Sequence, residues 1–171
     1  PLAPTLIRTP IFALIRARPF VMQTPPRQEI DPNMQISLVA ATQMNPALPA
    51  LDLAQSDLRF LVAQGPQQFG YHLIEYAGRV CYRSTDKMGA APGFIAARVR
   101  EGHEDIIEHL QMIFEVWGAT DAELLTAFQA AHGLRLTRRT DSVLLSMNAR
   151  TLRDIVRLAQ GELSRQLLQL A

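Results

Sequence analysis

The sequence lacks several features that would assign a function class directly. Cys81 is the only cysteine among 171 residues, so no disulfide can form within the chain, and a reducing cytosol is the expected environment. The 17 Lys and Arg against 16 Asp and Glu give a formal net charge of +1, which argues against nucleic-acid binding through a broad positive field. The apolar run from Ile11 to Ile15 is far too short to span a bilayer. We therefore expect a cytoplasmic protein with no nucleic-acid or membrane partner.

Lysine is almost missing as well. Lys87 is the only one, so nearly all of the positive charge is arginine. A planar guanidinium can donate two parallel hydrogen bonds to a phosphate or a carboxylate, which suits binding of anionic ligands. A GC-rich genome would produce the same bias. The arginine content is thus compatible with phosphate binding and does not require it.

The first 33 residues differ from the rest of the chain. Seven prolines exclude any long helix there: Pro1, Pro4, Pro10, Pro19, Pro25, Pro26 and Pro32. A signal peptide would need an uninterrupted apolar segment followed by a small-residue cleavage site, and neither is found. We expect residues 1–33 to be a disordered extension or to lie upstream of a start at Met34, with a membrane-surface arm as the alternative. Residues 34–171 then form one domain.

The pattern of apolar residues in that domain predicts an α+β fold in which helices pack on a small sheet. Alternation predicts strands over residues 34–42, 110–117 and 142–147. Helical spacing predicts helices over residues 52–64, 67–82, 94–100, 121–131 and 149–170. Residues 135–141 form a basic connector in this scheme. Ile36, Leu38 and Ala40 are expected on one face of the first strand, and the helix after Thr120 is expected to bury Leu124, Leu125 and Phe128.

The segment from Gly102 to His109 concentrates ionisable groups around two isoleucines. An α-helical rotation would place Glu104 beside Glu108 and Asp105 beside His109. A zinc site of the H-E-x-x-H kind needs two His four residues apart, whereas these are six apart, so we predict no metal. A purely structural interpretation remains open, in which Gly102 ends one helix and the acids favour the start of the next.

Three segments in a fixed order resemble the flavin-dependent thymidylate synthases. The first is Arg79-Val-Cys-Tyr82, the second is Gly102-His-Glu-Asp-Ile-Ile-Glu-His109 followed by a strand that contains Phe114, and the third is Asn148-Ala-Arg-Thr-Leu-Arg153. Members of that family carry Gly-His-Glu-x-x-x-Glu-His before a strand rich in Phe, and Asn-Ala-Arg-Ser-Leu at a helix start. The similarity extends over residues 34–171.

The resemblance implies roles for individual residues. His103 and Arg150 would act in catalysis, with Arg150 also contacting the deoxyuridylate. The flavin would be held by a larger set: Cys81, His103, Asp105, Glu108, Asn148, Asp154 and Leu158. Cys81 is not expected to be a nucleophile, because the family reduces the methylene group through its flavin. FAD would be the cofactor, NADPH and methylenetetrahydrofolate the co-substrates, dUMP the substrate that becomes dTMP, and a homo-oligomer, a tetramer in the family, the assembly.

The chain also departs from the family. Its Arg-His-Arg triplet, which binds flavin and orients the nucleotide phosphate, does not occur, and only residues 117–147 separate Val116 from Asn148. Arg138 and Arg139 could replace the lost phosphate contacts, although a solvated basic loop would look the same. The alternatives to an active enzyme are therefore an inactive flavin- or nucleotide-binding or structural descendant, and a fragmentary product without a function.

Overall fold

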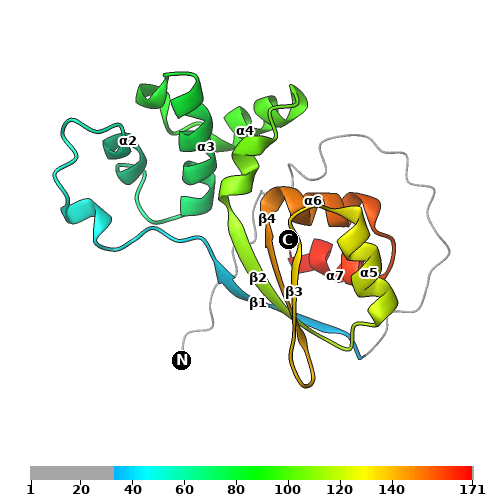
Figure 1. The fold of residues 1–171 in the computed structure, drawn as a ribbon. Coiled ribbons are helices and arrows are strands. Elements are labelled where there is room, and N and C mark those ends of the chain that lie inside the picture. Colours follow the sequence, from blue (N-terminus) through cyan, green and yellow to red (C-terminus); the bar gives the residue numbers. More distant parts are fainter. Residues whose placement is uncertain (1–32, 171) are drawn as a thin grey trace.

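A four-stranded antiparallel sheet forms the centre of the molecule (Figure 1). The computed structural model describes residues 33–170, so nearly all of the expected extension over residues 1–33 lies outside the described residues. The strands are β1 (Gln35–Ala41), β2 (Gln111–Trp117), β3 (Arg135–Arg138) and β4 (Val143–Asn148), in the order β1-β2-β4-β3. Together with the helices they make a mixed fold that is compatible with the expected α+β class.

The helices form two groups (Figure 1). One group lies beyond the end of the sheet where β2 begins, and it contains α2 (Leu58–Val62), α3 (Phe69–Cys81) and α4 (Ala91–Arg100). The other covers one face of the sheet with α5 (Asp121–Ala130), α6 (Ala149–Leu158) and α7 (Glu162–Leu170). Short 3-10 turns connect these elements: η1 (Leu48–Ala50), η2 (Thr85–Lys87) and η3 (Asp105–His109).

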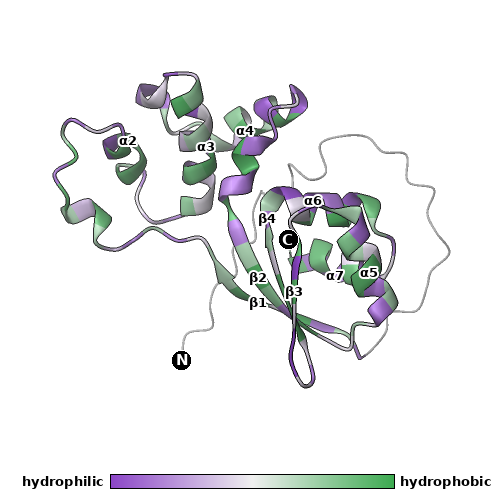
Figure 2. Ribbon diagram, in the orientation of Figure 1, coloured by the Kyte–Doolittle hydropathy of each residue, from purple (hydrophilic) through white to green (hydrophobic). Residues whose placement is uncertain are grey.

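Strict alternation in the central strands decides which face is covered. Met112, Phe114 and Val116 of β2 are buried, as are Val143, Leu145 and Met147 of β4. The residues between them are only half-buried, because no layer of helices covers the other face of the sheet. Figure 2 shows apolar stretches, in green, in the strands and in both groups of helices. Alternation in the sequence therefore predicted β2 correctly.

Two predicted burial patterns are wrong. In β1 the register shifts between Leu38 and Ala40, so Ala40 pairs with Ile113 and does not continue the face of Ile36. An extra residue in a strand shifts the alternation by one, and the sequence does not reveal it. In α5, Leu124 is buried but Leu125 and Phe128 are 55% and 54% exposed, because the helix turns Leu124 and Ala127 towards the core.

Three predicted elements also differ from the observed ones. The expected basic connector contains β3, whose residues are all exposed because it is an edge strand. The expected helix over residues 149–170 is two helices, broken at Gly161, which has φ +130°. The expected helix over residues 52–64 is reduced to α2. By contrast, the predicted capping role of Thr120 is confirmed, since its side chain accepts from Glu123 N and Glu123 bonds back to Thr120 N.

Within residues 33–170, none of the helices has both the length and the apolar character needed to traverse a bilayer.

Candidate functional site

The 3-10 turn η3 joins the two groups of helices. Ile106 and Ile107 are buried, and the turn packs against α3 on one side and the first half of α6 on the other. Its polar residues remain on the outside. Because a 3-10 turn has three residues per turn, Asp105 and Glu108 lie above one another, and the expected α-helical pairing of Glu104 with Glu108 does not apply. In this turn Asp105 therefore lies on the same face as Glu108, whereas an α-helix would have placed Glu104 there.

Two ion pairs connect η3 to α6. Glu108 Oε1 lies 2.6 Å from Arg150 Nη1, and Glu104 Oε2 lies 2.9 Å from Arg153 Nη2. The hydrogen bond that Arg150 donates to Glu108 is the largest cause that raises the pKa of Arg150 above its ordinary value, and the charges of Glu104 and Asp154 act in the same direction. The segments 102–109 and 148–153 therefore contact each other, through the acids of the first and the arginines of the second.

Arg153 is the buried member of this group. Its side chain is 5% exposed, and it also donates to Asp154 Oδ1 through Nε at 3.0 Å and Nη2 at 2.7 Å. Its Nη1 is buried and has no hydrogen-bond partner among the described residues. An unpaired guanidinium would be costly to bury, and Arg153 is paired with two carboxylates. These ion pairs hold Glu104 and Asp154 in fixed positions.

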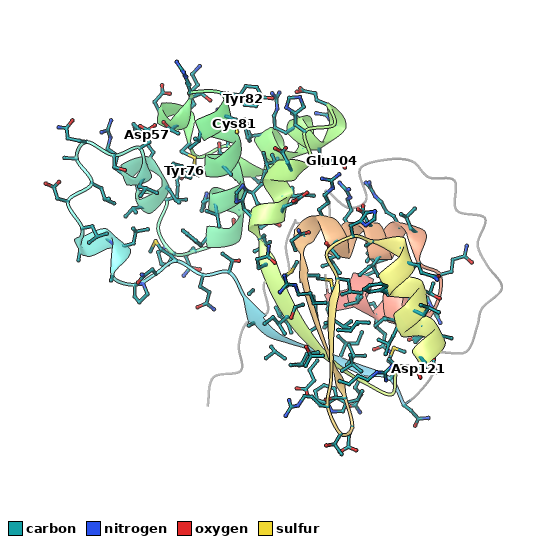
Figure 3. All side chains as sticks on the ribbon, in the orientation of Figure 1. Asp57, Tyr76, Cys81, Tyr82, Glu104 and Asp121 are labelled. Carbon is teal, nitrogen blue, oxygen red and sulfur yellow. The ribbon has the colours of Figure 1, made fainter. Side chains whose placement is uncertain are left out.

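Tyr82, the residue that follows α3, contacts His103, the residue before Glu104. The Tyr82 hydroxyl and His103 Nδ1 form a hydrogen bond, and their rings are stacked at a centroid distance of 5.9 Å and an interplanar angle of 12°. The guanidinium of Arg98 lies 5.0 Å from the Tyr82 ring centroid. Both rings are exposed, as is Cys81. Figure 3 labels Cys81, Tyr82 and Glu104, which belong to the region where α3, α4 and η3 meet.

A buried carboxylate fixes the end of α3. Glu75 is fully buried and accepts a hydrogen bond from Arg79 Nε at 2.8 Å. It also accepts from the backbone N–H of Gly89 at 3.1 Å and of Ala90 at 3.2 Å. These bonds tie the loop before α4 to α3. Because Arg79 is paired with Glu75 and its side chain is only 10% exposed, it is not available to a ligand.

Asn148 and Leu158 are positioned less favourably for a shared site. The Asn148 side chain accepts from Thr151 N at 2.8 Å and so caps α6. Leu158 is 66% exposed at the other end of that helix, about 12 Å along the axis from Arg150 at 1.5 Å per residue. Asp105 is exposed on η3. The structure thus groups Glu108, Arg150 and Asp154 with Glu104 and Arg153, places His103 next to Glu104 in the chain and against Tyr82, and leaves Leu158 outside this group.

Arg138 and Arg139 are not brought to Arg150. They lie at the hairpin end of β4, about 17 Å from Asn148 at 3.4 Å per residue of antiparallel strand. Arg138 pairs with Asp121 at 2.7 Å, and Arg139 pairs with Glu115 at 3.0 Å. Each guanidinium therefore has an acidic partner near its own strand.

The comparisons with known proteins add no relative. No family model matches the chain, and neither a curated protein nor a solved structure matches it. The candidate site therefore depends on the geometry of the described residues alone. Among residues 33–170 there is no group of three or more His, Cys, Asp or Glu side chains that could hold a metal ion.

Three members of this region were missing from the predicted site: Tyr82, Glu104 and Arg153. Each lies inside one of the three segments, so position in the sequence did point to them. What the sequence did not show is the pairing, because 49 positions separate Glu104 from Arg153 and 21 separate Tyr82 from His103.

Proposed function

We propose that this chain binds FAD and dUMP at the region formed by α3, η3 and α6, and that it acts as a flavin-dependent thymidylate synthase-like protein. In that role it would methylate dUMP to dTMP with methylenetetrahydrofolate and NADPH. The single observation that supports the proposal is that the three segments carrying the resemblance contact one another in order. Tyr82 bonds to His103, Glu104 to Arg153 and Glu108 to Arg150.

The chemical character of the region fits such ligands. The exposed Tyr82 and His103 rings offer a flat aromatic surface on which a planar heterocycle can stack. The Arg150 side chain is 42% exposed, so its guanidinium can also reach an anionic or pyrimidine oxygen. A bound flavin would supply the redox chemistry, while the residues of this chain would position and orient the reactants.

A second candidate is an inactive binding protein of the same ancestry. It is favoured by the absence of the Arg-His-Arg triplet and by the position of Arg138 and Arg139, which are paired with Asp121 and Glu115 at the far end of β4. Such a protein would retain flavin or nucleotide binding but would not turn over.

Purification and a coupled assay separate the two candidates. A yellow protein with dUMP-dependent NADPH oxidation in the presence of methylenetetrahydrofolate supports the enzyme. A yellow protein without that oxidation supports the inactive binder. A colourless protein that does not bind added FAD contradicts both.

A further inference from the structure

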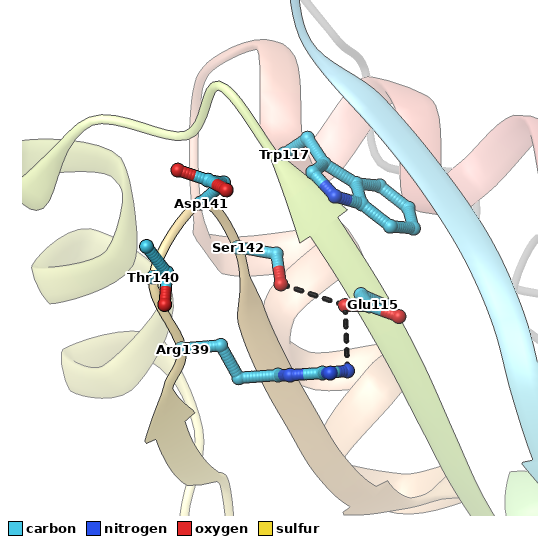
Figure 4. Close-up of a pocket in the computed structure, with 6 residues that line it drawn as sticks. All are labelled: Glu115, Trp117, Arg139, Thr140, Asp141 and Ser142. Carbon is cyan, nitrogen blue, oxygen red and sulfur yellow. Dashed lines mark hydrogen bonds and ion pairs between the residues drawn. The ribbon is translucent and has the colours of Figure 1, made fainter.

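A second region of the molecule has the composition of a ligand site. A pocket of about 470 Å³ opens on the sheet face that the helices leave uncovered. It is lined by Glu115, Trp117, Arg139, Thr140, Asp141 and Ser142. In Figure 4, Trp117 and Glu115 lie on one side along β2, Thr140 and Asp141 lie on the other, and the side chains of Ser142 and Arg139 extend towards Glu115. The pocket is at the hairpin end of β4, away from Arg150.

The polar groups between the two sides are held in place by bonds to one oxygen. Glu115 Oε1 accepts from Ser142 Oγ at 2.6 Å and from Arg139 Nη1 at 3.0 Å. The backbone N–H of Arg139 donates to the carbonyl of Ser142 at 2.8 Å, which closes the turn around Thr140 and Asp141. Among the described residues no group donates to Glu115 Oε2, so this oxygen can accept from a ligand.

The charge of the lining favours a cation. Glu115 and Asp141 contribute two negative charges and Arg139 contributes one positive charge, which leaves a net charge of −1. Asp141 is exposed, and within residues 33–170 it makes no ion pair or hydrogen bond through its side chain. An anion would meet two carboxylates here, so a phosphate is the wrong ligand for this pocket.

The indole ring of Trp117 also favours a cation as the ligand. Elsewhere in the described part of the chain, arginines lie over Phe60, Phe94 and Tyr82 at 4.4–5.5 Å from the ring centroid. The Trp117 ring, which is the best cation-binding ring of the natural side chains, has no such partner among residues 33–170. Arg139 does not serve as one, because its guanidinium is directed to Glu115.

We propose that this pocket binds an organic cation, a guanidinium or an alkylammonium group, against the face of Trp117, with Asp141 and Glu115 Oε2 accepting its N–H donors. A cation in this position would be attracted both by the quadrupole of the indole ring and by the two carboxylates. The site is independent of the flavin and nucleotide proposal, because it shares no residue with the region around Arg150.

The chain contains a single tryptophan, so its fluorescence reports on this pocket alone. The full chain is titrated with agmatine at constant ionic strength, and parallel titrations use sodium chloride, glucose and inorganic phosphate. We expect a saturable change with agmatine and none with the other three. The midpoint should rise at least fivefold in Asp141→Asn and should be unchanged in Asp86→Asn, an exposed aspartate on η2.

A second readout protects the test against a variant that fails to fold. Trp117→Phe is examined by calorimetry with agmatine and should bind more weakly than the wild type, because a phenyl face attracts cations less than an indole. The proposal is overturned if agmatine gives no saturable change. It is equally overturned if glucose or phosphate produces the same change, or if Asp141→Asn and Trp117→Phe bind agmatine as the wild type does.

Discussion

Glu108 Oε1 lies 2.6 Å from Arg150 Nη1, which joins the turn η3 to the first turn of α6 across 42 positions of sequence. The two side chains are 43% and 42% exposed. An ion pair this accessible to water contributes little to folding, roughly 0.2–1 kcal/mol. It does, however, occupy the guanidinium that the proposed function assigns to the nucleotide.

Replacing Glu108 by Gln should therefore help an anionic ligand more than it harms the fold. We expect Glu108→Gln to bind dUMP roughly two to five times more tightly, which corresponds to removing a competing interaction of about 1 kcal/mol or less. Calorimetric titration measures this. Asp121→Asn breaks the exposed Arg138–Asp121 pair, at the far end of β4, and should leave the affinity unchanged. Weaker binding by Glu108→Gln would show that Glu108 supports the ligand instead of competing with it.

The Arg153–Glu104 pair should behave in the opposite way, because Arg153 is buried. Arg153→Met leaves the carboxylates of Glu104 and Asp154 without their partner, and it should lower the free energy of unfolding by about 3 kcal/mol. Arg138→Met, which breaks a pair whose side chains are 66% and 82% exposed, should cost less than about 1 kcal/mol.

Urea unfolding of Arg153→Met, of Glu104→Gln and of the two combined gives the coupling between Arg153 and Glu104, and Arg138→Met is the control. The double variant should recover part of the loss, since no uncompensated charge remains at Glu104. Additive losses would mean that the two side chains do not stabilise each other.

Two glycines with similar backbones but different surroundings provide a matched comparison. Gly118 and Gly102 have φ +74° and +87°, where a side chain is strained. A Cβ at Gly118 would lie 2.5 Å from the carbonyl oxygen of Asn33, whereas a Cβ at Gly102 would meet no atom within 4 Å. Gly102→Ala should cost about 1 kcal/mol, and Gly118→Ala should cost clearly more. Equal melting temperatures for the two variants would show that the contact between Asn33 and Gly118 does not affect stability.

We expect the protein to lose stability at alkaline pH because of Tyr71 and Tyr76 of α3. Burial raises the pKa of the Tyr71 phenol well above its ordinary value of 10, and burial followed by the charge of Asp57 raises that of Tyr76. The unfolded chain therefore releases these protons first. Their contribution to stability is complete below pH 10 and decreases as the pH rises above 10.

Urea unfolding between pH 8.5 and 11 should follow that decrease. Tyr71→Phe should reduce its slope, and Phe69→Leu, which changes a buried ring of the same helix without a titrating group, should keep the wild-type slope. An unchanged slope in Tyr71→Phe would contradict the assigned burial of the phenol.

Local rules of alternation, spacing and capping predicted the central strand, the presence of α3 to within two residues at each end, and the cap of α5. They failed where long-range packing decides. Leu125 and Phe128 have the spacing of a buried stripe, yet α5 turns Leu124 and Ala127 inward. The bulge beside Ala40 and the edge strand β3 are set by pairing with other strands, and the residues of those segments do not encode that pairing locally.

The candidate site shows the same division. The sequence indicated the three segments, and the structure added the contacts Tyr82–His103 and Glu104–Arg153 that connect them. The assignments of His103, Arg150 and the flavin-binding residues remain predictions.

The most direct test is a titration of the purified full-length chain with FAD, followed by flavin absorbance and repeated in the presence of dUMP. We expect saturable binding by the wild type, at least tenfold weaker binding by His103→Ala and Arg150→Ala, and unchanged binding by Arg59→Ala, whose guanidinium lies on α2 over Phe60. Equal binding by all four proteins would contradict the central claim, and so would the absence of binding by the wild type.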